Sequence, residues 1–549
     1  MKWIKKTRGI VVALIFAVCF LAFTGKETDR FEIVKSLDVF TALFQQVNAL
    51  YVEEIQPGTL MQEGIDGMLK SLDPYTVYYP ESEIEDYKML TTGQYGGIGA
   101  RIRKIDSALV LYEVFEGSPA MKAGLKIGDE IIKVDDHILK NESSYDLSKL
   151  LKGLSGTTVK IAVKRNNKEL QVELKREEIT ISSIPYHAEV KDGIGYIKVH
   201  SFTREVTKEF QEALQDLKNN QACNALIIDL RGNPGGLLLE SIDMVNLFTK
   251  KGEKVVETKG KVEEWNKVYR NMNKPLDLEI PVVVLVDRKS ASASEIVSGS
   301  LQDMDRAVIV GESTFGKGLV QTTVSLPFSS SMKVTTAKYY IPSGRCIQEI
   351  DYGIRDESGN AVVLNDSIFK SYKTKNGRLV KDGHGIMPDV VVKEKIKGPE
   401  ILGILNQEHI FHYCNQYMDR YEGKIDSANI KVNEADLNHL FSYLKQQSTL
   451  YTSATEEALE KVKLTIKEDE KLSVMLESMK TKISAQKIEN LTKLREELQY
   501  ELEKEIARRI YFEKGLIKKE LEKDTVFTAA VNLLQNPEQY SGYLSNNPQ

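Results

Sequence analysis

The sequence predicts an α/β protein core, because short apolar runs typical of buried strands alternate with segments of helical spacing. Residues 225–230, 281–286 and 308–311 are such apolar runs, each bounded by glycine, proline or polar residues. Apolar residues at helical spacing follow the first two runs, over 238–248 and 293–301. Alternating strands and helices are typical of an α/β fold. The periodicity alone gives this class but does not identify the particular α/β fold.

Two helical regions flank this core. Residues 26–90 carry mostly helical patterning, and residues 398–549 change to amphipathic stripes among many charged side chains. The stripes are Phe40, Leu43, Phe44 and Val47 in the first region, and Leu437, Leu440, Phe441, Leu444, then Leu491, Leu494, Leu498, Leu502, Ile506 and Ile510 in the second. The residues of the last stripe are mostly four positions apart, so the stripe gradually moves around the helix. This fits a helix packed on a globular partner better than a long coiled coil. Two interpretations of 398–549 stay open: a solvated helical appendage, or a module for homo-oligomerisation or substrate tethering.

The composition excludes several classes of function. The chain has 549 residues, enough for several domains, and its net charge of −5 argues against nucleic acid as a partner. Its four cysteines, Cys19, Cys223, Cys346 and Cys414, have neither zinc-site nor Cys-x-x-Cys spacing. We therefore expect no metal ion and no cofactor.

The N-terminus has the features of an export signal. Basic residues at positions 2, 5, 6 and 8 precede an unbroken apolar run, Ile10 to Phe23, whose 14 residues are short for a membrane span. Residues 1–25 are therefore predicted to be a signal peptide or a membrane anchor. The chain is expected to be exported, and to lie in the periplasm or to be attached to the cytoplasmic membrane, facing outward, through residues 10–23.

Residues 91–178 combine a glycine-rich run with short strand-like segments. The run Tyr95-Gly96-Gly97-Ile98-Gly99 precedes short β-type runs and the segment Gly124–Ile131. In this order and at this distance, these segments resemble a PDZ domain. A PDZ domain binds the C-terminus of a peptide, which adds a strand to the sheet edge while backbone N–H groups of the glycine-rich loop bind its carboxylate. The resemblance therefore implies that the five residues of this run bind a peptide carboxylate.

A serine and a lysine supply the candidate catalytic chemistry. Ser292 lies between a buried strand run and a helical segment, and Glu295 follows three residues later in a capping-box pattern. Lys317 lies between two glycines, and a lysine can accept a serine proton if burial lowers its pKa from about 10.4 by roughly three units. Gln321, four positions after Lys317, is expected on the same face of an extended segment, where it can orient the neutral amine.

These residues make the chain similar to the carboxyl-terminal processing peptidases, which are tail-specific serine proteases of family S41. In that family the serine precedes the lysine by 25 positions and the glutamine follows four positions later, as Ser292, Lys317 and Gln321 do. Further family-like stretches between about Phe31 and Val392 are Leu72–Tyr75, Tyr95–Gly99, Gly195–Ile197, Asp229–Gly236, Tyr340–Gly344 and Gly385–Asp389. One stretch departs from the family, which often has Asn-x-Gly where this chain has Asp287-Arg288-Lys289.

The resemblance implies a crotonase-like, spiral-sheet α/β core over residues 179–397, with the PDZ domain inserted before it. It also implies an exported serine endopeptidase that cleaves proteins or peptides selected through their free C-termini. His200, in a strand run of this core, is expected to be structural. The alternative is a catalytically silent PDZ adaptor that binds protein C-termini and uses the α/β core as a scaffold.

The resemblance also assigns roles to single residues. Ser292 is expected to attack the peptide carbonyl, Lys317 to act as base and then as acid, and Gln321 to orient the lysine. The backbone N–H groups of Ala293 and Gly232 are expected to form the oxyanion hole.

Overall fold

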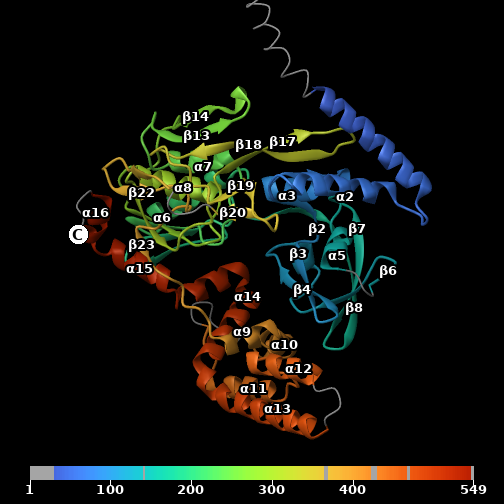
Figure 1. The fold of residues 1–549 in the computed structure, drawn as a ribbon. Helices are drawn as coiled ribbons and strands as arrows, with labels where there is room; N and C mark the ends of the chain where they lie inside the picture. The colour runs from blue at the N-terminus through green and yellow to red at the C-terminus, as the bar shows by residue number, and fades with distance from the viewer. Residues whose placement is uncertain (1–29, 140–142, 364–368, 422–429, 466–469, 546–549) are drawn as a thin grey trace, which may run out of the picture. The chain divides into compact units, whose positions relative to one another are not determined.

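The structure is a computed structural model (Figure 1), and it describes residues 30–139, 143–363, 369–421, 430–465 and 470–545. The chain divides into two compact units, Met1–Tyr78 and Tyr79–Gln549. The predicted leader, residues 1–25 with its apolar run 10–23, lies outside the described residues. No helix in the described ranges combines the length and the apolar character needed to cross a membrane.

The described part of the first unit, from residue 30 onward, is mostly helical, as predicted. A helix covers residues 30–50, and α2 (Pro57–Lys70) begins with a proline, whose missing N–H costs nothing at that position. The stripe predicted on the first helix forms, and the rings of Phe40 and Phe44 stack with centroids 6.5 Å apart. Phe40 is nevertheless exposed.

The domain that resembles a PDZ domain is an antiparallel sheet with two short helices. η1 (Glu81–Glu83) and α3 (Ile84–Thr92) lead into it. The sheet order is β3 (Ala100–Ile105), β4 (Ala108–Val114), β5 (Glu130–Val134), β7 (Thr158–Arg165) and β8 (Lys168–Lys175), with β6 (His137–Ile138) beside β5. The helices α4 (Pro119–Lys122) and α5 (Ser144–Leu151) contribute Ala120 and Leu147 to its core. β2 (Gln94–Gly97) pairs antiparallel with β9 (Glu177–Thr180), so the two ends of the domain lie side by side.

A mostly parallel sheet forms the core of the second unit. Its strand order is β10 (Tyr186–Lys191), β11 (Ile194–Lys198), β12 (Ala225–Asp229), β15 (Val282–Val286), β16 (Ala307–Gly311) and β23 (Val390–Val391). All neighbours are parallel except β10 and β11. The three apolar runs predicted as buried strands are β12, β15 and β16, which confirms them.

Helices cover both faces of this sheet, which is why its central strands are almost entirely apolar, except for the buried Asp229 at the end of β12. On one face, Ile228 and Val284 pack with α6 (Val206–Asn220), α7 (Leu238–Asn246) and α8 (Ala293–Asp303). On the other, Ile227 and Val283 pack with α15 (Thr525–Leu534) and α16 (Pro537–Leu544). The strands are therefore anchored from both sides, and the loops at their ends have fixed positions.

A second, antiparallel sheet lies beside the first. β18 (Ser331–Tyr340) pairs with β17 (Leu319–Ser325) and with β13 (Lys254–Gly260), and β13 pairs with β14 (Lys267–Arg270). β17 and β18 form an antiparallel hairpin across Pro327. Smaller elements are η2 (Glu263–Trp265), the pair β19 (Ile350–Arg355) and β20 (Ala361–Val363), and the pair β21 (Ser371–Lys373) and β22 (Leu379–Lys381).

The C-terminal helical region, predicted over residues 398–549, packs in two parts. The first part comprises α9 (Pro399–Asn406), α10 (His409–Tyr417), η4 (Met418–Arg420), α11 (Glu434–Lys445), α12 (Ala454–Thr465), α13 (Glu470–Asn490), η5 (Leu491–Leu494) and α14 (Arg495–Leu521). Leu440 and Leu502, from the two predicted stripes, are fully buried in its core. Past a break in α14, where Phe512 has a φ of 56°, Ile517 and Leu521 already pack with α15 and the protease sheet.

Candidate active site

Ser292 lies in a sharp turn between β15 and α8, as predicted. Its backbone has φ 56° and ψ −111°, a conformation that residues other than glycine rarely adopt. Such strain costs about 1–3 kcal/mol and persists only where the surrounding structure holds it, as in many active sites. Ala293, the next residue, begins α8, so its N–H has no acceptor within the helix.

The carboxylate of Asp287 holds this turn together with a neighbouring loop. Its Oδ1 accepts the N–H of Ser290 at 2.9 Å and that of Lys289 at 3.0 Å. The same oxygen accepts the N–H of Gly232 at 3.0 Å. The segment that departs from the family pattern therefore supplies a polar clamp for the serine turn.

The expectation that Gly232 contributes to the oxyanion hole is corrected by these contacts. Its N–H already donates to Asp287, and the residue lines a different cavity from that of Ser292. The loop that contains Gly232, residues 231–236, turns so that its far end, residues 234–236, lines the cleft of Ser292. A motif shows that several glycines are present but does not show which of them faces the nucleophile.

The far end of this loop lies against the serine turn. A Cβ on Gly235 would lie 2.9 Å from the nitrogen of Ala293 and 2.9 Å from the Cβ of Ser292, so only glycine allows this approach. The N–H of Gly235 donates to Asn233 Oδ1 at 2.8 Å. Within the described part of the chain, neither the N–H of Ala293 nor that of Gly236 has an acceptor. Both residues line the same cleft as Ser292.

Glu295 ties the serine turn to the lysine loop. Its carboxylate is fully buried in the first turn of α8. Oε2 accepts the N–H of Ser292 at 2.7 Å and that of Lys317 at 2.9 Å. Oε1 accepts the N–H of Gly316 at 2.7 Å and the hydroxyl of Thr314 at 2.6 Å. Burial raises the pKa of Glu295 to about 6, although these four donors oppose that rise.

Ser292, Lys317 and Gln321 line one cleft of about 530 Å³. Lys317 lies in the loop before β17, and Gln321 lies on that strand. A bulge between Val320 and Gln321 breaks the alternation on which the sequence argument for Gln321 depended. The glutamine still lines the cleft, and its Nε2 donates to Thr335 Oγ1 at 3.2 Å. The structure therefore brings the three predicted side chains to one site.

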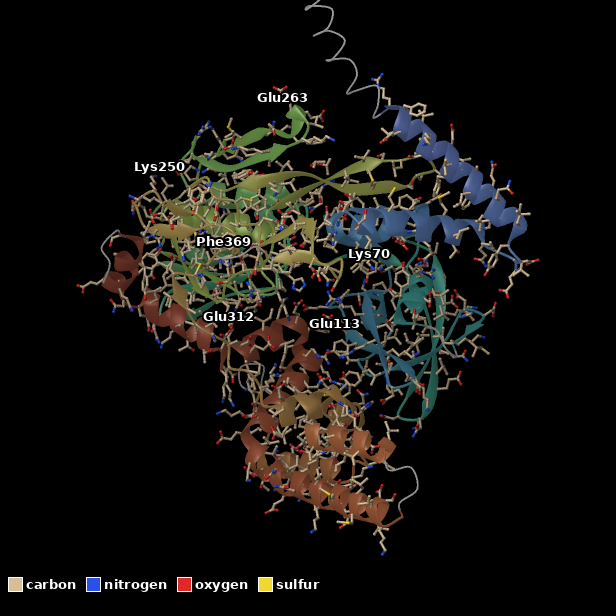
Figure 2. The ribbon with its side chains drawn as sticks, in the orientation of Figure 1. Lys70, Glu113, Lys250, Glu263, Glu312 and Phe369 are labelled. Carbon is tan, nitrogen blue, oxygen red and sulfur yellow. The ribbon has the colours of Figure 1, made fainter. Side chains whose placement is uncertain are left out.

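Further side chains line the cleft that sequence reasoning did not assign to the site, among them those of Tyr339, Arg101 and His200. The hydroxyl of Tyr339 donates to the backbone oxygen of Ser292 at 3.3 Å. Arg101, from β3, pairs at 3.0 Å with Glu113, which Figure 2 labels on β4. His200, expected to be a structural residue within a strand, lies beyond the end of β11, and burial lowers its pKa.

The predicted carboxylate-binding run begins in a strand and ends in the core of its domain. Tyr95, Gly96 and Gly97 belong to β2, whereas the side chain of Ile98 is buried. A Cβ on Gly96 would lie 2.1 Å from the oxygen of Gly153, so the close packing of this run requires glycine. β3, which follows the run, is the edge strand of its sheet. An unpaired edge beside a glycine-rich run is what strand addition by a peptide requires.

Comparisons with known proteins agree with this architecture. Models described as peptidase family S41 and as a PDZ domain match residues 193–357 and 96–175. A model described as the C-terminal helical domain of a probable PDZ-protease matches residues 401–534. A carboxy-terminal-processing protease of Bartonella bacilliformis is 35% identical over 346 residues, which cover 62% of this chain and 77% of that protein. The chain belongs to peptidase family S41.

Further relatives include the carboxy-terminal processing protease CtpA of Bacillus subtilis, which is 33% identical over 315 residues, 57% of this chain and 66% of that protein. Among solved structures, the photosystem II D1 C-terminal processing protease is 26% identical, with a TM-score of 0.34, over 64% of this chain and 92% of that chain. The S41 chain is thus a serine-type peptidase with a protease core, a PDZ domain and a C-terminal helical domain, which confirms the predicted fold class. A peptidase with a PDZ domain acts on protein or peptide substrates.

Proposed function

We propose that this peptidase is an exported endopeptidase of the C-terminal processing type, with Ser292 and Lys317 as its catalytic dyad. The observation that carries the proposal is the double anchoring by Glu295, one oxygen of which accepts the backbone N–H of both residues. A buried carboxylate that holds both backbones keeps the serine turn and the lysine loop in one arrangement. Preorganisation of this kind is what a nucleophile and its base require.

In the proposed mechanism the neutral amine of Lys317 takes the proton of the Ser292 hydroxyl as Oγ attacks the peptide carbonyl. The tetrahedral oxyanion is stabilised by the N–H groups of Ala293 and Gly236. Gly236 thus takes the role that the sequence suggested for Gly232. The lysine ammonium then gives its proton to the leaving amine, and the acyl-enzyme remains. Water, deprotonated by Lys317, attacks the ester; the lysine ammonium then returns the proton to Ser292 Oγ as the acid product leaves.

Gln321 is proposed to orient the lysine. Because its Nε2 donates to Thr335 Oγ1, Oε1 is the end of the amide that can accept a hydrogen bond from the amine of Lys317. This bond adds no charge to the site.

The PDZ domain is proposed to select substrates by their C-termini, through the run Tyr95–Gly99 and the edge of β3. Amidation of a substrate C-terminus removes the carboxylate charge and leaves the backbone donors mismatched, at a cost of about 1–3 kcal/mol. We therefore expect about tenfold to hundredfold lower kcat/KM for amidated than for free-acid forms of one unstructured peptide. Initial rates at limiting substrate measure the ratio, with Ser292→Ala as the inactive blank.

A variant without residues 95–179 is the matched control, because the antiparallel pairing of Gln94 with Thr180 keeps its new ends side by side. It should cleave both peptide forms at the same rate. Equal cleavage by the intact chain would exclude selection through the C-terminus but not the dyad. Binding of the free-acid peptide without any cleavage would instead favour the PDZ adaptor.

Export is proposed from the basic residues and the apolar run of the first 25 positions. We expect a protease added to intact spheroplasts to digest the catalytic domain, as followed by an antibody against residues 179–397. Deletion of residues 2–25 should make the same domain resistant until the cells are lysed. Resistance of the full-length chain before lysis would refute export.

A further inference from the structure

A buried cluster of charges joins the C-terminal helical region to the glycine loop beside Ser292. One terminal nitrogen of Arg231, the first residue of the loop, lies 2.6 Å from Asp229 and 2.6 Å from Asp524. Lys198 Nζ donates to the backbone oxygen of Arg231 at 2.7 Å and lies 3.3 Å from Asp229. The hydroxyl of Tyr196 donates to Asp229 at 2.7 Å.

The charges of this cluster balance only when Asp524 is included. Arg231 and Lys198 carry two positive charges, and Asp229 and Asp524 carry two negative charges. Burial alone would raise the pKa of Asp229, but the two cations outweigh it and hold that pKa well below its usual range. The Arg231 side chain is 16% exposed and that of Asp524 12%, so water screens their interaction little.

Arg231 begins a short and tightly bonded loop. Asn233 is fully buried; its Nδ2 donates to the oxygen of Val199 at 3.0 Å, and its own backbone oxygen accepts the hydroxyl of Ser294 at 3.0 Å. Two residues later, Gly235 meets the serine turn. A displacement of Arg231 therefore reaches the backbone beside Ser292 without a flexible segment in between.

The same C-terminal segment also holds the strand that leads to the nucleophile. The Tyr540 hydroxyl, on α16, accepts the N–H of Val282 at 2.9 Å and lies 3.1 Å from the oxygen of that residue. Val282 begins β15, and the turn at Ser292 follows this strand. Residues far beyond the protease core in sequence thus contact both the strand and the loop that form the site.

We propose that Asp524 is a positioning residue for catalysis: through Arg231 it holds the loop whose far end supplies a donor for the oxyanion. The C-terminal helical region then supports catalysis through this one contact and is not only an appendage. This inference rests on the proposed oxyanion role of Gly236. Donors that are misplaced by a fraction of an ångström stabilise the transition state less while they leave substrate binding nearly unchanged.

The variant Asp524→Asn tests this role without disturbing the helix. Asp524 is also the N-cap of α15, where its Oδ1 accepts the N–H of Phe527 at 2.9 Å. Asparagine caps helices as well as aspartate does, but its amide group would face the guanidinium with donors instead of a charged acceptor. We expect kcat on a short peptide to fall about tenfold, with KM changed less than twofold.

A double-mutant cycle with Arg231→Met separates positioning from general stability. If Asp524 acts through Arg231, Asp524→Asn should change kcat less than twofold in the Arg231→Met background. The control is Glu503→Gln, which removes the buried 2.8 Å pair with Lys519 within the helical region and should lower Tm while kcat stays the same.

Unchanged kcat in Asp524→Asn, or a tenfold loss in both backgrounds, would overturn the inference. Either result leaves the proposed function intact as long as the wild type cleaves the peptide and Ser292→Ala does not. An inactive wild type would refute the proposed function itself.

Discussion

Exchange of Lys317 for arginine is expected to lower kcat/KM by roughly ten-thousandfold, close to the effect of Ser292→Ala. The guanidinium keeps the positive charge of the side chain but does not lose its proton in the working pH range, so it cannot deprotonate the serine. The backbone of residue 317 stays in place, because Glu295 holds it through the N–H, which the substitution does not change. Initial rates on an unstructured peptide measure the loss, and the wild-type rate should rise with pH as the lysine loses its proton.

Lys333→Arg is the matched control, because Lys333 lines the same cleft without being assigned to the dyad. Its rate should stay within about twofold of the wild type. Substantial activity in Lys317→Arg would mean that another group accepts the serine proton. His200 would then be the first candidate, since it also lines the cleft, and His200→Ala should in that case be inactive.

The sequence predicts a catalytic residue best where that residue directly follows a recognisable strand or helix. Ser292 follows the apolar run that forms β15, so its place at a strand–helix junction can be read locally. Lys317 and Gln321 are identified only by their spacing from the serine in a known family. Glu295 was expected only to cap a helix, because its bonds to Gly316 and Lys317 cross 21 and 22 positions and no local pattern encodes them.

The same limit applies to the fold. β12, β15 and β16 are predictable because strands buried on both faces are mostly apolar. β23, with two residues, has no such signal. The apolar face of α15 would look the same in sequence whether it packed on the helical region or on the protease sheet. The ion pair between Asp524 and Arg231 depends on that packing, and the sequence therefore gives no indication of it.

The Glu295→Gln variant is expected to lose about a hundredfold or more in kcat and about 2–4 kcal/mol of unfolding free energy. The carboxylate accepts four hydrogen bonds, whereas a glutamine amide turns one acceptor into donors that face other donors. Each buried donor without a partner costs about 1–3 kcal/mol. Removal of a buried charge offsets part of this, because a pKa raised from 4.5 to about 6 corresponds to about 2 kcal/mol at neutral pH. Peptide cleavage and denaturant unfolding measure the two effects.

Asp303→Asn is the control for stability alone. Asp303 ends the same helix, is buried, and lies 2.9 Å from Arg345, far along α8 from Ser292. Its substitution should also lower the free energy of unfolding, but kcat at a temperature where the protein is folded should stay within about twofold. An equal loss of kcat in both variants would mean that Glu295 matters only for global stability.

The pH dependence of the unfolding free energy and of kcat distinguishes a positioning role of Glu295 from a purely structural one. Because burial raises its pKa, the folded state binds the proton more tightly than the unfolded state, and its ionisation lowers stability as pH rises from 4.5 to about 6. As pH falls from 7 to 4.5, this group should therefore add about 2 kcal/mol to the unfolding free energy of the wild type. Glu295→Gln lacks the group, so the difference in unfolding free energy between wild type and variant should increase by the same amount. The ratio of wild-type kcat to Glu295→Gln kcat should decrease over the same pH range, since protonation turns an acceptor of the wild-type carboxylate into a donor. Parallel trends of stability and kcat with pH would contradict the proposal that this carboxylate positions the serine and the lysine.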